Sequence, residues 1–290
     1  MSDGATKNLR WQIGDVEVIR VEERVHGVHR DTLVPGITDA HLAEHAEWVS
    51  PYFSASGRLL LSVHSFVVRD GDFTMVVDTC AGTEPRRPLE GDPEFLGRLD
   101  AAIDGGLAAV DVVLCTHLHF DHIGWNTRIV DDVRVPTFPN ARYLFARIEL
   151  EAADDEDAAL LAPHVSPLVE AGRVDLVETD ATLRPSIRLL PTPGHTPGHV
   201  SVFIESRGES AVITGDILHT PLQVAHPELT ASPFDADPDA ATETRQRFLD
   251  DHAGEGCLWL GTHFPPPTAG FVLGSKQGRR FEARRPDEEG

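Results

Sequence analysis

The sequence predicts an α/β fold that is built from short strands and single helices. Apolar runs rich in β-branched residues recur along the 290-residue chain, and most of them end in a loop that contains Gly, Pro or Asp. Two longer segments between these runs have helical spacing together with start and stop residues. Strands interleaved with single helices are typical of a layered α/β domain. We expect one such domain over residues 1–290.

The predicted strands are the apolar, β-branched runs. In chain order they cover residues 16–21, 59–68, 73–79, 110–116, 186–190, 199–206, 210–216 and 257–263. The first predicted helix covers residues 92–106 and stops at a glycine. The second covers residues 235–254, with Asp237 as N-cap, Pro238 in the first turn and Gly254 at its end.

Three further segments fit neither pattern. Residues 26–57 are too long for an ordinary connection, so we predict a partly helical arm or lid there. The acidic run at residues 151–159 is predicted to be a solvated helix end or loop, and residues 278–290 a tail.

The acidic start of the second predicted helix has the spacing of a calcium loop, with Asp235, Asp237 and Asp239. However, Ala240 and Gln246 stand where the turn glycine and the bidentate glutamate of such a loop belong. The segment is therefore predicted to be a helix cap.

Charge and cysteine content exclude several classes of protein. The formal charge of −22, from 47 acidic and 25 basic residues, repels nucleic acids and anionic membranes. No window approaches the ~18 unbroken apolar residues of a membrane span, and the N-terminus lacks the apolar stretch of a secretory signal. Cys80, Cys115 and Cys257 are odd in number and far apart, which argues against a disulfide framework. We expect a cytoplasmic protein that acts on a small molecule.

The stretch CTHLHFDHIG (residues 115–124) places three histidines and an aspartate directly after an apolar run. Imidazoles and carboxylates are costly to bury unless something pairs with them, and a metal ion would do so. Side chains two residues apart on an extended segment point the same way, so His117 and His119 are expected to share one ion. Asp121 and His122 follow where the chain turns, and they can face a second ion.

The remaining ligands are expected from three other predicted strand ends, at His195, Asp216 and His263. A lone histidine is more often a surface or core residue, but several strand ends that all deliver ligands indicate a metal centre. The predicted sets are His117, His119 and His195 for one ion, and Asp121, His122 and His263 for the other, with Asp216 offering an oxygen to each. This donor set suits two zinc ions, and manganese, cobalt or iron are possible.

The motif H-x-H-x-D-H, with the later His, Asp and His, resembles the metallo-β-lactamase superfamily over about residues 59–264. The resemblance implies an αββα sandwich of the metallo-β-lactamase type, with a dinuclear site at one edge between the sheets. It also implies that Asp78 supports the site from behind the ligands. A hydroxide between the two ions is the expected nucleophile, and Asp121 is placed to hold and relay its proton.

Two segments, PTPGHTPGHVSVFIES and GDILHTPLQVAHPE, are similar to the branch that contains N-acyl-homoserine lactonases and methyl parathion hydrolase. His219 stands where homoserine lactonases often carry a tyrosine, and we expect it to be a catalytic residue that donates a hydrogen bond to the substrate. His199 is predicted to be a supporting or strand-pairing residue, while His64 could face the pocket or the core.

The substrate is expected to be neutral, because the expected pocket walls are mostly apolar and carry no lysine. These walls are Phe120, Ile123, Trp125, His219, Leu222 and part of the arm. A lactone or an aryl ester fits best. A phosphotriester is the alternative, followed by a β-lactam or thioester, and an inactive metal-bound scaffold is the non-enzyme alternative. The arm could also provide a homodimer contact.

Overall fold

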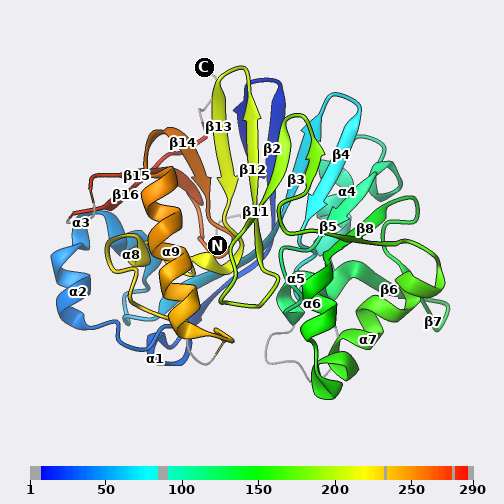
Figure 1. Ribbon diagram of the computed structural model, residues 1–290, viewed down its shortest axis with the longest axis horizontal. Coiled ribbons are helices and arrows are strands. Elements are labelled where there is room, and N and C mark those ends of the chain that lie inside the picture. Colours follow the sequence, from blue (N-terminus) through cyan, green and yellow to red (C-terminus); the bar gives the residue numbers. More distant parts are fainter. Residues whose placement is uncertain (1–7, 84–90, 232–233, 276–277, 287–290) are drawn as a thin grey trace, which may run out of the picture. The chain divides into compact units, whose positions relative to one another are not determined.

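The computed structural model describes residues 8–83, 91–231, 234–275 and 278–286. These residues form a mixed α/β structure with two seven-stranded sheets and a small two-stranded one (Figure 1). The chain divides into two compact units. The first comprises the residues up to Arg24, Val63–Phe145 and Ala153–Leu176, and the second comprises Val25–Ser62, Ala146–Ala152 and the residues from Val177 onward. That residues 1–290 make one domain stays a prediction.

The first large sheet has the strand order β1-β2-β3-β4-β5-β8-β9. Its strands are β1 (Leu9–Ile13), β2 (Val16–Val28), β3 (Leu59–Asp70), β4 (Phe73–Val77), β5 (Val112–Leu114), β8 (Arg142–Ala146) and β9 (Val174–Val177). β4, β5 and β8 are parallel to one another. The carboxyl ends of neighbouring parallel strands meet at one sheet edge, so the loops that follow β4 and β5 lie side by side.

The helices of the first unit follow these strands. They are α4 (Phe95–Ala102), α5 (Phe120–Ile123) and α7 (Asp155–Glu170). The α4 helix falls inside the predicted segment 92–106. The two-stranded sheet of β6 (Thr127–Val130) and β7 (Val133–Pro136) packs beside α7.

The second large sheet has the order β10-β11-β12-β13-β14-β15-β16. Its strands are β10 (Thr182–Arg184), β11 (Ile187–Pro191), β12 (Val200–Ser206), β13 (Glu209–Ile213), β14 (Gly254–Leu260), β15 (Ala269–Leu273) and β16 (Arg280–Ala283). β13 and β14 are parallel, and the other neighbouring pairs are antiparallel. Because of that one parallel pair, Asp216 and His263 follow strands that end at the same edge.

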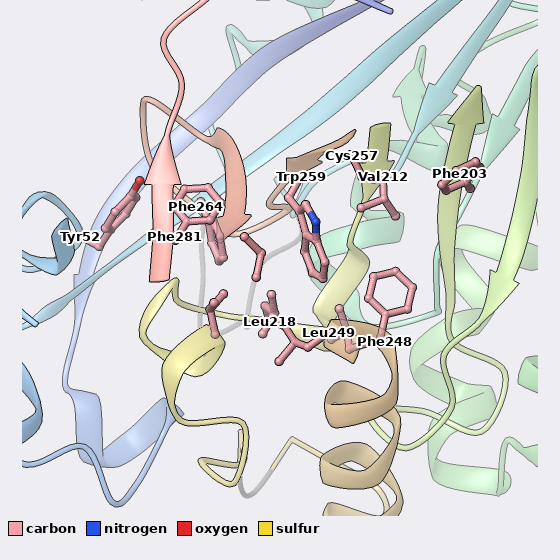
Figure 2. Close-up of a cluster of buried hydrophobic side chains, with 13 residues drawn as sticks. Tyr52, Phe203, Val212, Leu218, Phe248, Leu249, Cys257, Trp259, Phe264 and Phe281 are labelled. Carbon is pink, nitrogen blue, oxygen red and sulfur yellow. The ribbon is translucent and has the colours of Figure 1, made fainter. Parts of the chain in front are cut away.

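The α9 helix (Pro238–His252) packs on the second sheet and confirms the second predicted helix. Its N-cap is Asp237, whose carboxylate accepts a hydrogen bond from the Ala240 N–H at 3.0 Å. Figure 2 shows the buried cluster that α9 shares with the strands, with Phe248 edge-to-face against Trp259 at 5.3 Å between ring centroids. The apolar face of α9 therefore holds it on the sheet.

The arm contains α1 (Arg30–Leu33), α2 (Asp39–Glu44), α3 (Ala46–Val49) and a 3₁₀ turn (Ser50–Tyr52), so the prediction of a partly helical arm is confirmed. Its first residues differ from the prediction, because β2 continues to Val28. One buried cluster joins the arm to the rest of the second unit, and its members are Leu33, Val34, Ile37, Val49, Leu59, Leu61, Leu222 and Leu229. The arm is thus part of the core of this unit.

The tail prediction is wrong for Arg280–Ala283, which form the edge strand β16 beside β15. The Phe281 side chain stabilises this strand against the core, because Phe281 is 1% exposed and its ring packs edge-to-face on Phe264. The acidic run covers the end of α6 (Arg147–Ala152) and the start of α7, as predicted. The three cysteines are free and buried, which agrees with the prediction of no disulfide framework. Within the described ranges, none of the helices has the length and apolarity needed to cross a membrane.

Candidate metal centre

The predicted ligands fall in both units. His117, His119, Asp121 and His122 belong to the first unit, and His195, Asp216 and His263 belong to the second.

The ligands of the first unit lie close together in the loop after β5. The His117 ring is 4.6 Å from that of His119 and 4.0 Å from that of His122, between ring centroids. His119 is the N-cap residue of α5, which places Asp121 and His122 in the first turn of that helix. The Nε2 atom of His122 lies 3.8 Å from Oδ1 of Asp121. The structure therefore places these four side chains close together, and their division between two ions stays a prediction.

Asp78, at the end of β4, holds the His122 ring in place. Its Oδ2 lies 2.9 Å from Nδ1 of His122, and the Thr116 N–H and hydroxyl donate to its two oxygens at 2.7 and 2.9 Å. A carboxylate at Nδ1 keeps the proton there, so Nε2 presents its lone pair toward Asp121. Asp78 therefore has the supporting position that the resemblance implied.

Backbone hydrogen bonds join the loop after β4 to the segment after β5 that carries the predicted metal ligands. The Thr79 N–H donates to the His122 carbonyl at 2.7 Å, and the Gly124 N–H donates to the Cys80 carbonyl at 2.7 Å. A Cβ atom on Gly124 would lie 2.0 Å from the Ala81 carbonyl, so this close approach requires glycine. The sequence HIG thus ends in glycine because the neighbouring backbone occupies the space of a side chain.

Three imidazoles of the second unit converge on one carboxylate oxygen. Oδ2 of Asp216 lies 3.0 Å from Nε2 of His263, 3.2 Å from Nε2 of His219 and 3.4 Å from Nε2 of His195. His195, Asp216 and His219 each offer one ligand atom within 4.8 Å of the others. All four side chains are buried. The predicted ligands of this unit are therefore brought together, and His219 joins them.

Each of the two predicted ligand histidines of this unit, His195 and His263, has a partner on its outer nitrogen. Nδ1 of His195 lies 2.8 Å from Oδ1 of Asp235, and Nδ1 of His263 lies 2.9 Å from the Ser62 carbonyl. These acceptors keep the proton on Nδ1, so that both Nε2 atoms present lone pairs toward Asp216.

His199 supports Asp216 from behind, as predicted. Its Nε2 accepts the Asp216 N–H at 2.8 Å, and its Nδ1 contacts the Thr192 hydroxyl and carbonyl at 2.8 and 3.1 Å. Both ring nitrogens of His199 are therefore engaged away from the ligand oxygens.

Asp235 contacts the predicted ligand His195, and the sequence did not indicate this contact because a helix cap accounted for the acidic segment. Asp237 is the cap, and Asp235 instead contacts His195 and accepts the Ala231 N–H at 2.8 Å. Burial alone would raise the pKa of Asp235, but the hydrogen bond with His195 and the nearby imidazoles hold it below its usual value. Nothing local in the sequence joins Asp235 to His195.

His219 is held by Gln223, whose Oε1 accepts the His219 N–H at 2.7 Å. Burial lowers the pKa of His219 below its usual value, and the opposing charge of Asp216 does not cancel this effect, so the ring is neutral near pH 7. Its Nδ1 is buried with no hydrogen-bond partner among the described residues. That His219 donates to a substrate stays a prediction.

Several expected pocket walls belong to the core instead. Trp125 donates from Nε1 to Glu23 at 2.6 Å and stacks on Phe95, and Leu222 lies in the apolar cluster under the arm. Ile123 is 1% exposed. These three wall assignments are wrong, because apolar residues beside the motif pack inward. His64 is buried and lies edge-to-face on Phe66 at 4.8 Å, so its ring contacts the core.

The donor chemistry fits a divalent transition metal. Both sets are made of imidazole nitrogens and carboxylate oxygens, and an acceptor on the outer nitrogen orients His122, His195 and His263. Such carboxylate- or carbonyl-backed histidines are typical of zinc and related metals.

A family model of the metallo-beta-lactamase superfamily matches residues 58–253. The chain belongs to this superfamily, and it has the metallo-β-lactamase fold that its motif predicted. Family, fold and the buried His/Asp donors together define a metal-dependent hydrolase.

Two curated relatives show how far the likeness in sequence extends. An N-acyl homoserine lactonase from Bacillus thuringiensis is 33% identical over 104 residues, which is 35% of this chain and 35% of the lactonase. The matched stretch thus covers about a third of the length of that relative. The probable metallo-hydrolase YybB from Bacillus subtilis (strain 168) is 28% identical over 176 residues, which is 59% of this chain and 69% of YybB.

Two solved structures share the fold over nearly the whole chain. Hydrolase AbOPH of the beta lactamase superfamily is similar with a TM-score of 0.79 and 24% identity, over 94% of this chain and 96% of AbOPH. AidC, a dizinc quorum-quenching lactonase in complex with a homoserine product, is similar with a TM-score of 0.74 and 22% identity, over 96% of this chain and 97% of AidC.

Proposed function

We propose that this chain is a dinuclear metallohydrolase that opens a neutral lactone or cleaves an aryl ester. One ion would be held by His117, His119 and His195, and the other by Asp121, His122 and His263, while Asp216 would offer an oxygen to each. When bound, such ions supply an activated water and stabilise negative charge on the substrate oxygen.

The observation that carries the proposal is the convergence of three buried Nε2 atoms on one oxygen of Asp216, at 3.0 to 3.4 Å. A folding role does not require this arrangement, since a single partner would satisfy the carboxylate oxygen. A shared carboxylate surrounded by oriented imidazoles is what a metal-bridging ligand needs. The lactonase from Bacillus thuringiensis and the dizinc lactonase AidC support the same chemistry.

Other residues of the chain would orient the ligands, transfer a proton and bind the substrate oxygen. Asp78 and Asp235 set the orientation of His122 and His195, so the ligand nitrogens need no rearrangement to bind. The Asp121 carboxylate is partly exposed in the first turn of α5, where it can accept and return a proton. His219 is neutral, so one of its ring nitrogens carries a hydrogen that it can donate to a substrate oxygen.

A phosphotriester is the second candidate substrate. His219 occupies the place where homoserine lactonases often carry a tyrosine, and organophosphate-hydrolase-like members resemble this chain there. The same ions and the same proton relay would serve a phosphoryl centre, because both reactions place negative charge on an oxygen.

The test is a metal count followed by a hydrolysis panel of lactones, aryl esters, phosphotriesters, thioesters and β-lactams. We expect kcat/KM to be highest for a lactone or an aryl ester. Asp216→Ala should lower metal content and activity together. His219→Ala should lower kcat/KM while the metal content is kept. His29→Ala is the matched control, because His29 is an exposed histidine of the arm. Efficient cleavage of β-lactams or thioesters, with no activity on any lactone or ester, would contradict the proposal.

A further inference from the structure

Three histidines of the second unit gather away from the ligands described above. His41 lies on α2 and His45 is the C-cap of that helix, so one arm helix presents both. His226 follows the short helix α8 (Leu222–Ala225). The His41 ring stacks on His226 at 4.4 Å between centroids, and Nε2 of His45 lies 3.0 Å from Nε2 of His226. The proposed hydrolysis uses none of them.

The hydrogen bonds around His226 prepare its Nε2 as a ligand. Nδ1 of His226 lies 3.1 Å from Oε1 of Glu228, and a carboxylate there holds the proton on Nδ1. The lone pair of His226 then points from Nε2 toward Nε2 of His45. Two nitrogens this close need either a proton or a cation between them.

The donor set and its spacing fit a cation. Glu44, His45 and His226 each offer one ligand atom, and these atoms lie within 4.8 Å of one another. Adjacent ligands of a tetrahedral zinc with bonds near 2.05 Å lie about 3.3 Å apart. The 3.0 Å between the two Nε2 atoms is close to this value. Glu44 is exposed, so its side chain can turn toward the two nitrogens.

We propose that Glu44, His45 and His226 form a further metal site, which takes a divalent first-row ion such as zinc and fastens the arm to the segment after α8. The same two parts of the chain already meet in the apolar cluster that contains Val49, Leu222 and Leu229. The ion would add a polar clamp at the edge of that contact. Two imidazoles and one carboxylate supply three ligands, and water would complete a tetrahedral zinc as the fourth.

The clamp also acts on a segment that matters for the proposed catalytic centre. Gln223 lies in α8, and its Oε1 holds the His219 N–H. An ion at His226 would restrain the carboxyl end of this short helix. Binding of zinc should therefore order the arm without taking part in the hydrolysis.

The test is zinc binding to the full-length holoenzyme by equilibrium dialysis, with the metal counted by mass spectrometry. Wild type should bind one zinc per chain more than His45→Gln and His226→Gln, or bind it at least tenfold more tightly. His29→Gln is the matched control and should bind as wild type does. The comparison is a difference between variants, so it does not depend on how many ions the Asp216 ligands hold.

Hydrogen exchange supplies a second measurement. Zinc should slow exchange of the amides of residues 38–49 in wild type and leave it unchanged in His226→Gln. Equal zinc counts and equal exchange in wild type and in both variants would overturn the proposal. Loss of the extra zinc in both variants would support the proposal whether or not the proposed hydrolysis is found.

Discussion

Replacing Asp235 by asparagine tests how the second unit prepares His195. The side chain of Asp235 is fully buried, with Oδ1 at 2.8 Å from Nδ1 of His195 and Oδ2 accepting the Ala231 N–H at 2.8 Å. Asparagine has the same shape, but only its oxygen can accept the Ala231 N–H. Its NH₂ group would then face Nδ1 of His195 and move the ring proton to Nε2. That nitrogen would no longer present a lone pair to a metal.

The expected loss follows from the change of tautomer. Mutation of such a supporting partner typically weakens metal affinity or activity 10- to 100-fold, which is about 1.4 to 2.7 kcal/mol. The assay is zinc affinity by chelator competition, together with kcat/KM on the best substrate of the panel. Circular dichroism should first show that the variant is folded, because Arg245 lies 3.9 Å from Asp235 and loses a counter-charge.

The matched control is Asp237→Asn, which removes the same charge two residues further along. Asp237 caps α9, and asparagine caps helices as well as aspartate does, so this variant should keep zinc affinity and activity within about threefold of wild type. If folded Asp235→Asn binds zinc and turns over substrate as Asp237→Asn does, then Asp235 does not set the tautomer of His195 and the reasoning is refuted.

Further predictions concern stability. Gly124→Ala should prevent folding or lower the melting temperature sharply, since its Cβ would lie 2.0 Å from the Ala81 carbonyl, whereas Gly97→Ala has open space on helix α4 and should be neutral or stabilising by up to about 1 kcal/mol. Leu249→Ala should cost about 2 to 5 kcal/mol of unfolding free energy by urea denaturation, because Leu249 is a fully buried residue by which α9 joins the apolar cluster of the second unit. The lowered pKa of Asp235 means that its contribution to stability is present above the ordinary carboxyl pKa and is lost as pH falls through the lower folded value. In metal-free protein, the stability difference between wild type and Asp235→Asn should therefore shrink below about pH 4, and a difference that is constant with pH would contradict this.

The sequence allowed the metal motif to be found because its ligands are chemically unusual. His117, His119, Asp121 and His122 stand directly after an apolar run, and such a cluster has no common folding role. Strand ends then pointed to Asp216 and His263, and the parallel pairing of β13 and β14 explains why these two meet. In each case the local pattern carried the information.

Other features depend on contacts between distant segments, which no local pattern carries. Asp235 lies forty residues from His195, in an acidic stretch for which a helix cap was a sufficient explanation. Trp125 and Leu222 looked like pocket walls because they flank the motifs, but their partners in the core are remote in sequence. The α7 helix could not be predicted from the sequence, because it contains Pro163 and Pro167, and prolines normally break helices.

His122, His195 and His263 differ in whether a mutation can remove the group that orients their rings. His122 and His195 depend on the side chains of Asp78 and Asp235, each of which a single codon substitution can remove. His263 depends on the main-chain carbonyl of Ser62, which is present whatever residue stands there. The contact to His263 therefore survives any substitution at position 62 that fits the buried site and preserves β3, whereas the contacts to His122 and His195 need aspartate at positions 78 and 235. In a saturation library, we expect aspartate to be strongly retained at positions 78 and 235, and position 62 to accept other small residues that fit its buried place in β3.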